Sequence, residues 1–298
     1  MKFLDVRTDF AFKKVFGSKE SKPRLISFLN AVIDFQGASA ITDLEIVDPY
    51  NLPQLKGMKD TFVDVKAVLN DESTVIIEMQ VLNHPGFENR ILYNTAKNYS
   101  TQLVQGQRYD LLKPVIALTI VNFAMFEDND DMINAYKIIN KKHFTDYTDD
   151  IELVFIELNK FNKTQAQCQG IQDDWIFFLK NAGDLTMIPD NLPESVYTAY
   201  EVSNEAGMSR EELEIQYNKQ QYIAIQLGSI EMVKQQAEVA AKKAREQGLE
   251  QGLEQGLEQG VKNVAINMIR AQSMSDESIA QMTSLTVEQI AELKASLE

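Results

Sequence analysis

Cysteine and histidine are scarce in this 298-residue chain, and their scarcity excludes several kinds of site. A single cysteine, Cys168, excludes an intramolecular disulfide and a zinc module built from several cysteines. Only two histidines are present, His84 and His143, which disfavours a metal site based on imidazole. Any metal is therefore expected to be a hard cation with oxygen ligands, Mg²⁺ or Mn²⁺.

Long apolar runs are missing as well. No run is long enough to span a bilayer, and the first residues lack the pattern of a signal peptide. We therefore expect a cytoplasmic protein without a membrane partner. The hydrophobic content of 44% and the charged content of 24% are those of a globular protein. The length allows one substantial domain with an appendage, or two small domains.

Positive charge is in short supply, because 29 Lys and Arg face 44 Asp and Glu, for a net charge of −15. This balance argues against loose binding of nucleic acid, in which phosphate neutralisation dominates the affinity. Residues 1–30 are an exception, with a local charge of +4 from seven bases and three acids. The bases are Lys2, Arg7, Lys13, Lys14, Lys19, Lys22 and Arg24. Such a cluster fits a solvated helix face or a surface that faces phosphate.

Two β-rich runs, residues 62–69 and 74–81, flank a turn-like segment at residues 70–73. If this hairpin is symmetrical about its turn, Asp64 lies opposite Glu78 on the neighbouring strand. Two carboxylates in this arrangement are close enough to share a metal ion. Carboxylates on the solvent face of a hairpin are also common without any function. Asp is depleted in strands, however, and facing like charges require a cation or a raised pKa.

The period of 2 in a strand divides the hairpin into two faces. The predicted core face is apolar throughout: Val63, Val65, Ala67, Leu69, Val75, Ile77, Met79 and Val81. The other face collects the polar groups: Phe62, Asp64, Lys66, Val68, Thr74, Ile76, Glu78 and Gln80. We interpret the second face as the working face.

The series Asp64 … Ile-Ile-Glu78-Met-Gln80 resembles the core of the PD-(D/E)XK nuclease superfamily, and in particular its recombination-promoting nuclease and transposase branch, the Rpn family. Residues 8–17, Thr-Asp-Phe-Ala-Phe-Lys-Lys-Val-Phe-Gly, resemble the opening helix of that family. Residues 155–161, Phe-Ile-Glu-Leu-Asn-Lys-Phe, and the Gly-rich tail resemble it too. The ordered set of four segments is more specific than the hairpin motif alone.

Periodicity predicts an α/β order of helix, three strands, helix and strand, followed by an α-helical C-terminal region. The resemblance implies that the first part is a restriction-endonuclease-like core. The predicted elements are one or two helices in residues 8–34, a strand at 41–49, the hairpin, a helix at 87–106, and strands at 114–123 and 151–158. The predicted parts are a core at 1–165, a helical region at 166–245 on or beside it, a repeat at 246–260, and a small helical segment at 261–298.

The sequence predicts four local features of these helices. Thr8 is a plausible N-cap, and Trp175 is expected to be a core anchor rather than a binding residue. Gly106 is placed as the C-cap of the helix at 87–106. The apolar stripe expected on that helix is Ile91, Leu92, Ala96, Tyr99 and Leu103.

Residues 246–260 repeat the unit Gly-Leu-Glu-Gln. On a helix, Gly248, Gly252, Gly256 and Gly260 form a slowly drifting column beside a ridge of leucines. Each Gly costs about 1 kcal/mol in a helix relative to Ala. Close packing of a partner helix on the column, and hence a homo-oligomer, is one interpretation. A flexible or partly helical linker is the other.

In the segment that follows, residues 261–298, we favour a small helical bundle over sequence-specific DNA binding, because Glu288 and Glu292 make its last helix acidic.

The resemblance implies a DNA substrate and a divalent metal held by Asp64 and Glu78, with Asp9 as a third ligand. Asp9 equally suits a helix N-terminus. Lys13, Lys14, Arg90 and Tyr93 are candidate substrate contacts, with ordinary helix-surface roles as the alternative. Asp60 and Glu45 are carboxylates that the sequence leaves unplaced.

The superfamily motif has Lys two residues after its second acid, where this chain has Gln80. Gln orients a water but carries no charge, so Lys66 is a candidate for the missing cation. The resemblance implies a Mg²⁺-dependent DNA endonuclease associated with recombination or transposition. The alternatives are a nuclease-fold module that binds DNA or protein without catalysis, and a nuclease silenced by its own tail or by a partner.

Overall fold

The computed structural model describes residues 1–35, 40–51 and 61–297. It divides into two compact units, Met1–Leu227 and Gly228–Glu298, which are described separately. The predicted division of the chain at residues 165, 245 and 260 stays a prediction.

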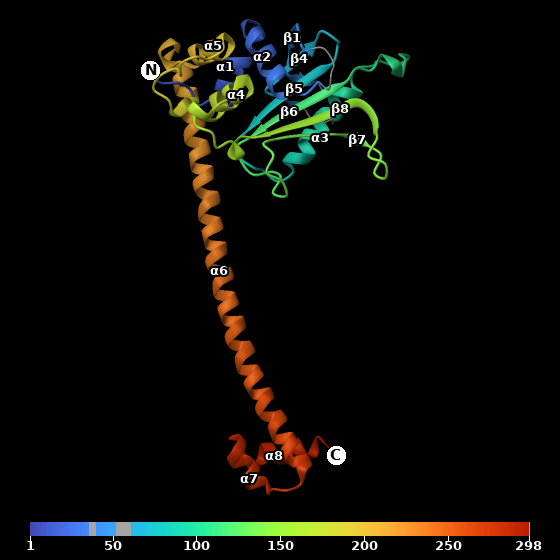
Figure 1. Ribbon diagram of the computed structural model, residues 1–298, viewed down its shortest axis with the longest axis vertical. Helices are drawn as coiled ribbons and strands as arrows, with labels where there is room; N and C mark the ends of the chain where they lie inside the picture. Colours follow the sequence, from blue (N-terminus) through green and yellow to red (C-terminus); the bar gives the residue numbers. More distant parts are fainter. Residues whose placement is uncertain (36–39, 52–60, 298) are drawn as a thin grey trace. The chain divides into compact units, whose positions relative to one another are not determined.

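A mixed six-stranded sheet in the order β1-β4-β5-β6-β8-β7 forms the centre of the first unit (Figure 1). Strands β5, β6 and β8 run parallel, and the other neighbours are antiparallel. The strands are β1 Leu44–Val47, β4 Val65–Leu69, β5 Thr74–Gln80, β6 Val115–Val121, β7 Ile133–Ile139 and β8 Asp146–Glu157. A separate ribbon pairs β2 Tyr50–Asn51 with β3 Thr61–Phe62. The α/β class predicted from the sequence is confirmed.

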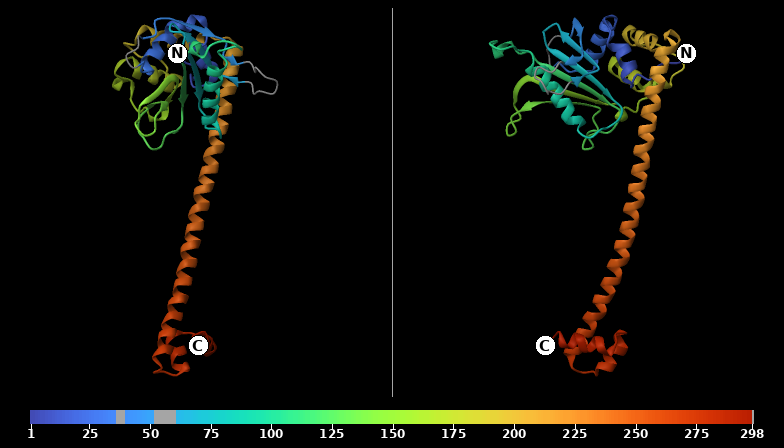
Figure 2. Two further views of the ribbon diagram at one scale, coloured as in Figure 1. Left: turned by 90° about the vertical axis from the view of Figure 1, so that its right-hand side faces the viewer. Right: turned by 180° about the vertical axis from the view of Figure 1, so that it is seen from behind.

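Helices cover both faces of this sheet (Figures 1 and 2). The larger hydrophobic core joins one face to four helices, and α3 Phe87–Ser100 packs on the other face. The four helices are α1 Asp9–Phe16, α2 Lys22–Val32, α4 Gly170–Asn181 and α5 Glu194–Ser203. The chain continues with α6 Arg210–Ala271, α7 Asp276–Thr283 and α8 Val287–Ala295.

An aromatic cluster anchors the helical layer of the larger core. Trp175 is fully buried, and its ring lies 5.6 Å from that of Phe16 and 5.7 Å from that of Phe28. Burial of such a side chain contributes about 1.5–3 kcal/mol, and favourable ring pairs add about 0.5–1.5 kcal/mol. The expectation that Trp175 is a core residue is confirmed. The N-cap is confirmed too, since the Thr8 side chain accepts a hydrogen bond from the Ala11 amide.

The structure corrects the prediction for α3. The helix ends at Ser100, and Gly106 lies in a later turn with φ +90°, so it is not the C-cap. The predicted apolar stripe is also wrong, because Leu92 is 53% exposed and Ala96 is exposed, while Asn94 is buried. The buried positions are Phe87, Ile91, Asn94, Thr95, Lys97 and Asn98. The helix thus turns a largely polar face toward the sheet.

Strands β7 and β2 were not predicted, and Phe62, predicted as the start of the first hairpin strand, belongs instead to β3 of the β2–β3 ribbon. Most side chains of β7 are exposed, because it is the edge strand that pairs only with β8. An exposed edge strand lacks the alternation of buried and exposed residues on which the prediction depends. The ribbon strands have two residues each, which is too short for a periodic signal.

The second unit contains the rest of α6 and the two last helices. Residues 246–260 lie within α6 and are helical throughout. Ser275 and Thr286 cap α7 and α8, and Ala265, Ile279 and Ile290 form their shared core. The short helices predicted in this segment are present and pack together, and the choice of a bundle over DNA reading stays a prediction. Within the described residues, no helix combines the length and apolar character needed to cross a bilayer.

Candidate active site

The candidate site lies where β4 begins and β5 ends. The β4–β5 ladder pairs Val65 with Ile77, so Asp64 and Glu78 are the next residues along the two strands, as predicted. Asp64 itself is outside β4. Its amide donates to Ile77 O at 3.0 Å, and its side-chain Oδ2 accepts from the Met79 amide at 2.8 Å. The carboxylate therefore takes over a backbone role at the point where the strand breaks.

This break corrects the two predicted faces of the hairpin. Val63 was expected beside Val65 on the core face, but it packs in the second cluster with Ile76 and Ile91. The irregularity at Asp64 shifts the alternation by one residue, which sends Val63 to the other side. The working face is also not open along its length, since Ile76 is only 4% exposed beneath α3. Only the end of the face presents polar groups.

Both carboxylates are largely buried and each has one cationic partner. The side chain of Asp64 is 13% exposed, and the Lys13 ammonium lies 3.3 Å from its Oδ1. The side chain of Glu78 is 14% exposed and pairs with the guanidinium of Arg90. Helix α1 thus supplies one cation and α3 supplies the other.

The two acids share an unfavourable electrostatic environment. Burial raises the pKa of Asp64, although the Met79 amide and Lys13 act in the opposite direction. Burial also raises the pKa of Glu78; Arg90 opposes that shift and the charge of Asp64 reinforces it. Acids with raised pKa values that repel each other are stabilised in their ionised form by a cation between them.

Arg90 links Glu78 to the residue that departs from the superfamily motif. Its guanidinium donates to Gln80 Oε1 at 2.8 Å, and the Gln80 amide donates to Leu82 O at 2.8 Å. The guanidinium also lies over the ring of Phe87, 5.2 Å from its centroid. Positive charge is therefore present beside Gln80, on a side chain from another element.

The oxygen atoms around Glu78 fit a hard cation. Asn94 donates a side-chain hydrogen bond to Glu78, and its own amide oxygen is buried without a donor among the described protein atoms. Glu78, Asn94 and Thr119 line a small hollow between β5, β6 and α3. Carboxylate and amide oxygens are the ligands that Mg²⁺ and Mn²⁺ accept, usually together with several waters. The donor set is therefore chemically suitable for the implied metal.

The other predicted site residues have different partners. Asp9 pairs with Lys219 of α6 at 3.1 Å, and Lys14 pairs with Glu212. Burial lowers the pKa of Lys66, and the charge of Asp48 opposes that shift. Tyr93 is 40% exposed on α3. In the described ranges, no three or more His, Cys, Asp or Glu residues gather in a metal-binding cluster.

Neither of the two carboxylates that the sequence left unplaced, Glu45 and Asp60, is found at the site among the described residues. Glu45 is exposed on β1, opposite Val68, and Asp60 lies outside the described residues. Sequence reasoning missed Asn94, which lies outside the apolar stripe that was predicted for this helix. Its position four residues after Arg90 was an available signal, because residues four apart share one face of a helix.

A sheet covered by helices on both faces, with acidic residues on neighbouring antiparallel strands, defines the class of PD-(D/E)XK nuclease folds. A family model described as PD-(D/E)XK nuclease family transposase matches residues 6–237. Because the match covers most of the chain, this protein belongs to that family. It is therefore assigned to nuclease-type enzymes linked with recombination. No match was found among curated proteins or solved structures.

Proposed function

We propose that this protein is a DNA endonuclease that depends on a divalent cation, Mg²⁺ or Mn²⁺, and acts in recombination or transposition in the cytoplasm. The main support is the pair of buried carboxylates, Asp64 and Glu78, on neighbouring strands; burial raises the pKa of both, and the charge of Asp64 raises that of Glu78 further. Such a pair is poorly explained by stability, because two adjacent buried acids repel each other.

Asp64 and Glu78 are the proposed ligands, with Asp9 as a third ligand or a partner of a metal-bound water. When bound, the cation supplies charge neutralisation at the phosphoryl group and lowers the pKa of a water. The protein contributes the two largely buried carboxylates at the end of the β4–β5 hairpin. It also contributes the basic side chains of Lys13 and Arg90, which balance their charge. Lys13 and Arg90 hold the acids in their ionised form before a divalent cation binds.

The Gln80–Arg90 pair is our proposed substitute for the lysine of the superfamily motif. Gln80 orients a water or a phosphate oxygen, and Arg90 supplies the charge that an amide lacks. Lys66 was the candidate from the sequence; Arg90 is preferred because it contacts both Glu78 and Gln80. Arg90→Met should slow cleavage about a hundredfold, whereas Lys66→Met should change it little. The opposite result would return this role to Lys66.

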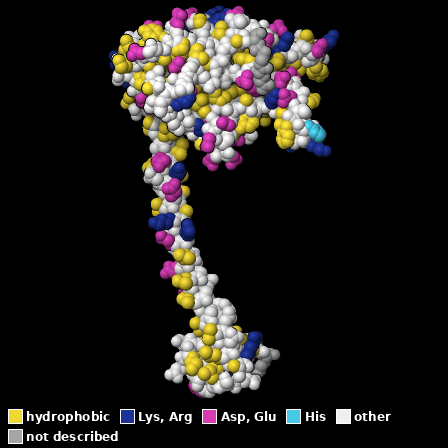
Figure 3. All heavy atoms as spheres, in the orientation of Figure 1, with side chains coloured by type: hydrophobic (Ala, Val, Ile, Leu, Met, Phe, Trp, Pro, Cys, Tyr) yellow, Lys and Arg dark blue, Asp and Glu magenta, His cyan; other side chains and the backbone are white. Residues whose placement is uncertain are grey.

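The DNA backbone is proposed to contact Lys13 and Lys14 of α1 and Arg90 and Tyr93 of α3. Lys13 and Arg90 pair with the two carboxylates. Lys13 and Lys14 belong to the basic N-terminal cluster. On the face seen in Figure 3, acidic and basic side chains are interspersed over the first unit. Binding that depends on a few placed cations, rather than on overall charge, suits this surface.

The decisive experiment incubates the purified protein with supercoiled plasmid in the presence of Mg²⁺, Mn²⁺ or EDTA. Wild type should cleave only with a divalent cation. Asp64→Asn and Glu78→Gln should reduce cleavage at least about a hundredfold, because even outer partners of metal ligands account for 10–100-fold. Glu45→Gln, an exposed acid on β1, is the matched control and should behave as wild type. Cleavage that persists in both site variants would refute the assignment.

A binding module without catalysis is the second candidate. Gln80 in place of lysine and the net charge of −15 favour it. This candidate is favoured if wild type binds DNA but cleaves none with any of the cations.

The third candidate is a nuclease silenced by its own tail. It predicts that removal of residues 246–298 activates cleavage. We also propose that the tail self-associates through the exposed Leu249, Leu253 and Leu257, which lie beside the glycine column.

A further inference from the structure

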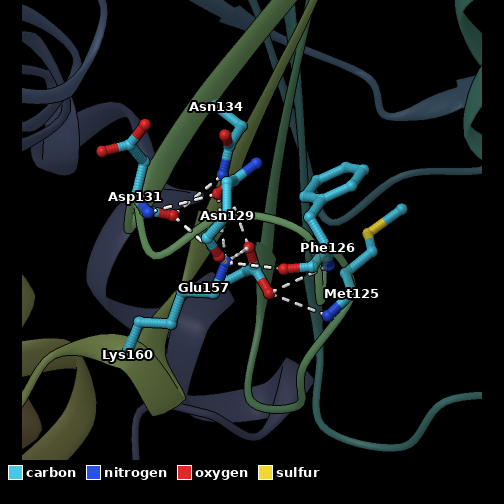
Figure 4. Close-up of polar contacts among 7 residues, drawn as sticks. All are labelled: Met125, Phe126, Asn129, Asp131, Asn134, Glu157 and Lys160. Carbon is cyan, nitrogen blue, oxygen red and sulfur yellow. Dashed lines mark hydrogen bonds and ion pairs between the residues drawn. The ribbon is translucent and has the colours of Figure 1, made fainter.

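A lysine ammonium is enclosed by oxygen atoms at the end of β8 (Figure 4). Lys160 Nζ lies 2.7 Å from Glu157 Oε2, 2.8 Å from Asn129 O and 2.9 Å from Phe126 O. Asp131 O at 3.3 Å and Asn129 Oδ1 at 3.4 Å complete the set. An ammonium has three N–H donors, so five oxygens exceed what directed hydrogen bonds can use. The group is held as a cation in a cage.

Glu157 is the fixed wall of this cage. Its side chain is 0% exposed, and it is one of the few fully buried acids of the described chain. Oε1 accepts from the amides of Met125 and Phe126 at 2.7 and 3.3 Å. The second oxygen accepts from Lys160 and from the Asn134 amide at 3.4 Å. The bonds from Met125 and Phe126 to Glu157, together with those from Lys160 to Phe126, Asn129 and Asp131, fix the segment of residues 122–132 that connects β6 to β7.

The cage lies at the same end of the strands as the candidate site, because Gln80, Val121 and Glu157 are the last residues of β5, β6 and β8. Gln80 pairs with Val121, and Val121 pairs with Glu157, so the three residues form one row across β5, β6 and β8. Residues paired in this way point to the same face of a sheet. Glu157 therefore lies on the face of Gln80, two strands away. The Asn122 amide, which begins the connecting loop, donates to Gln80 O at 3.1 Å.

The next loop residue continues the connection to Arg90. The ring of Phe123 meets that of Phe87 edge to face, with centroids 5.9 Å apart. Phe87 in turn supports the Arg90 guanidinium, which bonds Gln80 and pairs with Glu78. The loop fixed by Lys160 thus carries the ring that supports the ring beneath Arg90.

We propose that Lys160 is a positioning residue: its ammonium serves as a built-in cation that fixes residues 122–132, and Phe123 in that loop holds Arg90 on Glu78 and Gln80. The inference rests on the proposed function, in which Arg90 acts on the phosphate. It adds that the polar cage at the end of β8 sets the geometry of a side chain it does not touch.

A double-mutant cycle tests the link to Arg90. Lys160→Met, Arg90→Met and the double variant are compared in single-turnover cleavage of plasmid DNA. Lys160→Met should slow cleavage about tenfold or more, and the double variant should be no slower than Arg90→Met alone, because both changes remove the same interaction. Effects that multiply would overturn the proposal.

Lys163→Met is the matched control for this cycle. Lys163 also pairs with a buried acid, Asp173, at 2.6 Å, but it lies outside the cage. Its effect should multiply with that of Arg90→Met. If Lys160→Met does not fold, Phe123→Leu replaces it, because that change leaves the cage intact and removes only the ring contact. Independence of Phe123→Leu and Arg90→Met would also overturn the proposal.

The cage is also tested by thermal unfolding, which does not depend on DNA cleavage. Failure of the cage can therefore be distinguished from failure of the proposed nuclease function. Lys160→Ala should lower the unfolding midpoint by about 10 °C, since it leaves a buried charge unpaired. Propylammonium restores the missing part of the side chain and should recover much of that loss. Tetramethylammonium at equal ionic strength should not, because it donates no hydrogen bonds. Equal recovery by both salts would refute the cage. Absence of cleavage in wild type would instead refute the nuclease.

Discussion

Asp64 accepts a hydrogen bond from the backbone amide of Met79, 2.8 Å from its Oδ2. The carboxylate that is proposed to hold the metal therefore also closes the β4–β5 hairpin at its open end. One oxygen serves the fold, and the other faces Lys13 at 3.3 Å. Asp64 thus has a structural and a chemical role, and substitutions can separate the two.

Asp64→Asn should keep the fold and lose the chemistry. The amide oxygen of Asn can still accept from Met79, so the free energy of unfolding should stay within about 1 kcal/mol of wild type. Asp64→Ala leaves the Met79 amide without a partner and should cost about 1–3 kcal/mol. Urea unfolding of the two variants checks this order. Equal loss in both would show that the hydrogen bond contributes nothing.

The stability of the metal-free protein should depend on pH through the two acids. The folded state raises the pKa of Asp64 above 3.8 and of Glu78 above 4.5, chiefly by burial. In the window between these values and the folded-state pKa values, the folded state binds more protons than the unfolded state. The contribution to stability is therefore complete below the window and is lost as pH rises through it.

Urea unfolding in EDTA across this window provides the measurement. The double variant Asp64→Asn/Glu78→Gln should show a smaller decline than wild type, and Glu45→Gln should keep the full decline. Part of the decline should remain in the double variant, because burial also raises the pKa values of Glu152 and Asp174. Divalent cations compete with protons for the same oxygens, so their affinity should rise with pH over the same window. A wild-type profile that the double variant reproduces would contradict the assignment of these shifts.

The hairpin shows how much of the site the sequence can predict. Strand composition and the turn at residues 70–73 were sufficient to predict the register, which brings Asp64 and Glu78 together. The break before Val65 was not predicted, because it depends on a side chain that bonds the neighbouring backbone. No local pattern of apolar residues reports such a bond, so Val63 was assigned to the wrong face.

The partners of the acids were beyond sequence reasoning for a related reason. Lys13 reaches Asp64 from α1, which is distant along the chain, and Arg90 reaches Glu78 from α3, the helix that follows β5; the direction of neither side chain is encoded in a local pattern. The apolar stripe predicted for α3 failed because Asn94 and Asn98 are buried there in place of leucine. Tertiary contacts with the site outweighed the apolar periodicity in that helix.

The first turns of α6 should be required for the order of α1. Gln216 is 2% exposed; its Oε1 accepts from the Thr8 hydroxyl at 2.7 Å, and its amide donates to Asp5 O at 3.2 Å. Thr8 is the N-cap of the helix that carries Lys13. Gln216→Ala should therefore lower the free energy of unfolding by about 1–3 kcal/mol.

Hydrogen exchange of the α1 amides gives the local measurement for this variant. Protection should fall in α1, and Gln236→Ala, on an exposed part of α6, should change neither quantity. Loss of stability without faster exchange in α1 would place the effect elsewhere. The family match ends at residue 237, so it includes these turns of α6.

The glycine column of α6 separates helix propensity from self-association. Apart from the adjacent backbone of α6, a methyl group added at Gly248, Gly252, Gly256 or Gly260 meets no atom of the described residues within 4 Å. Replacement of all four by Ala should raise helix content and stabilise α6 by a few kcal/mol, at about 1 kcal/mol per site. If a second copy packs closely on the column, the same methyl groups block it, and the mass in solution should fall.

Circular dichroism measures the helix content, and sedimentation equilibrium measures the mass. Gly207→Ala, outside α6, is the control. Higher helicity with an unchanged mass would rule out close packing on the column, because the methyl groups would have had no partner to displace.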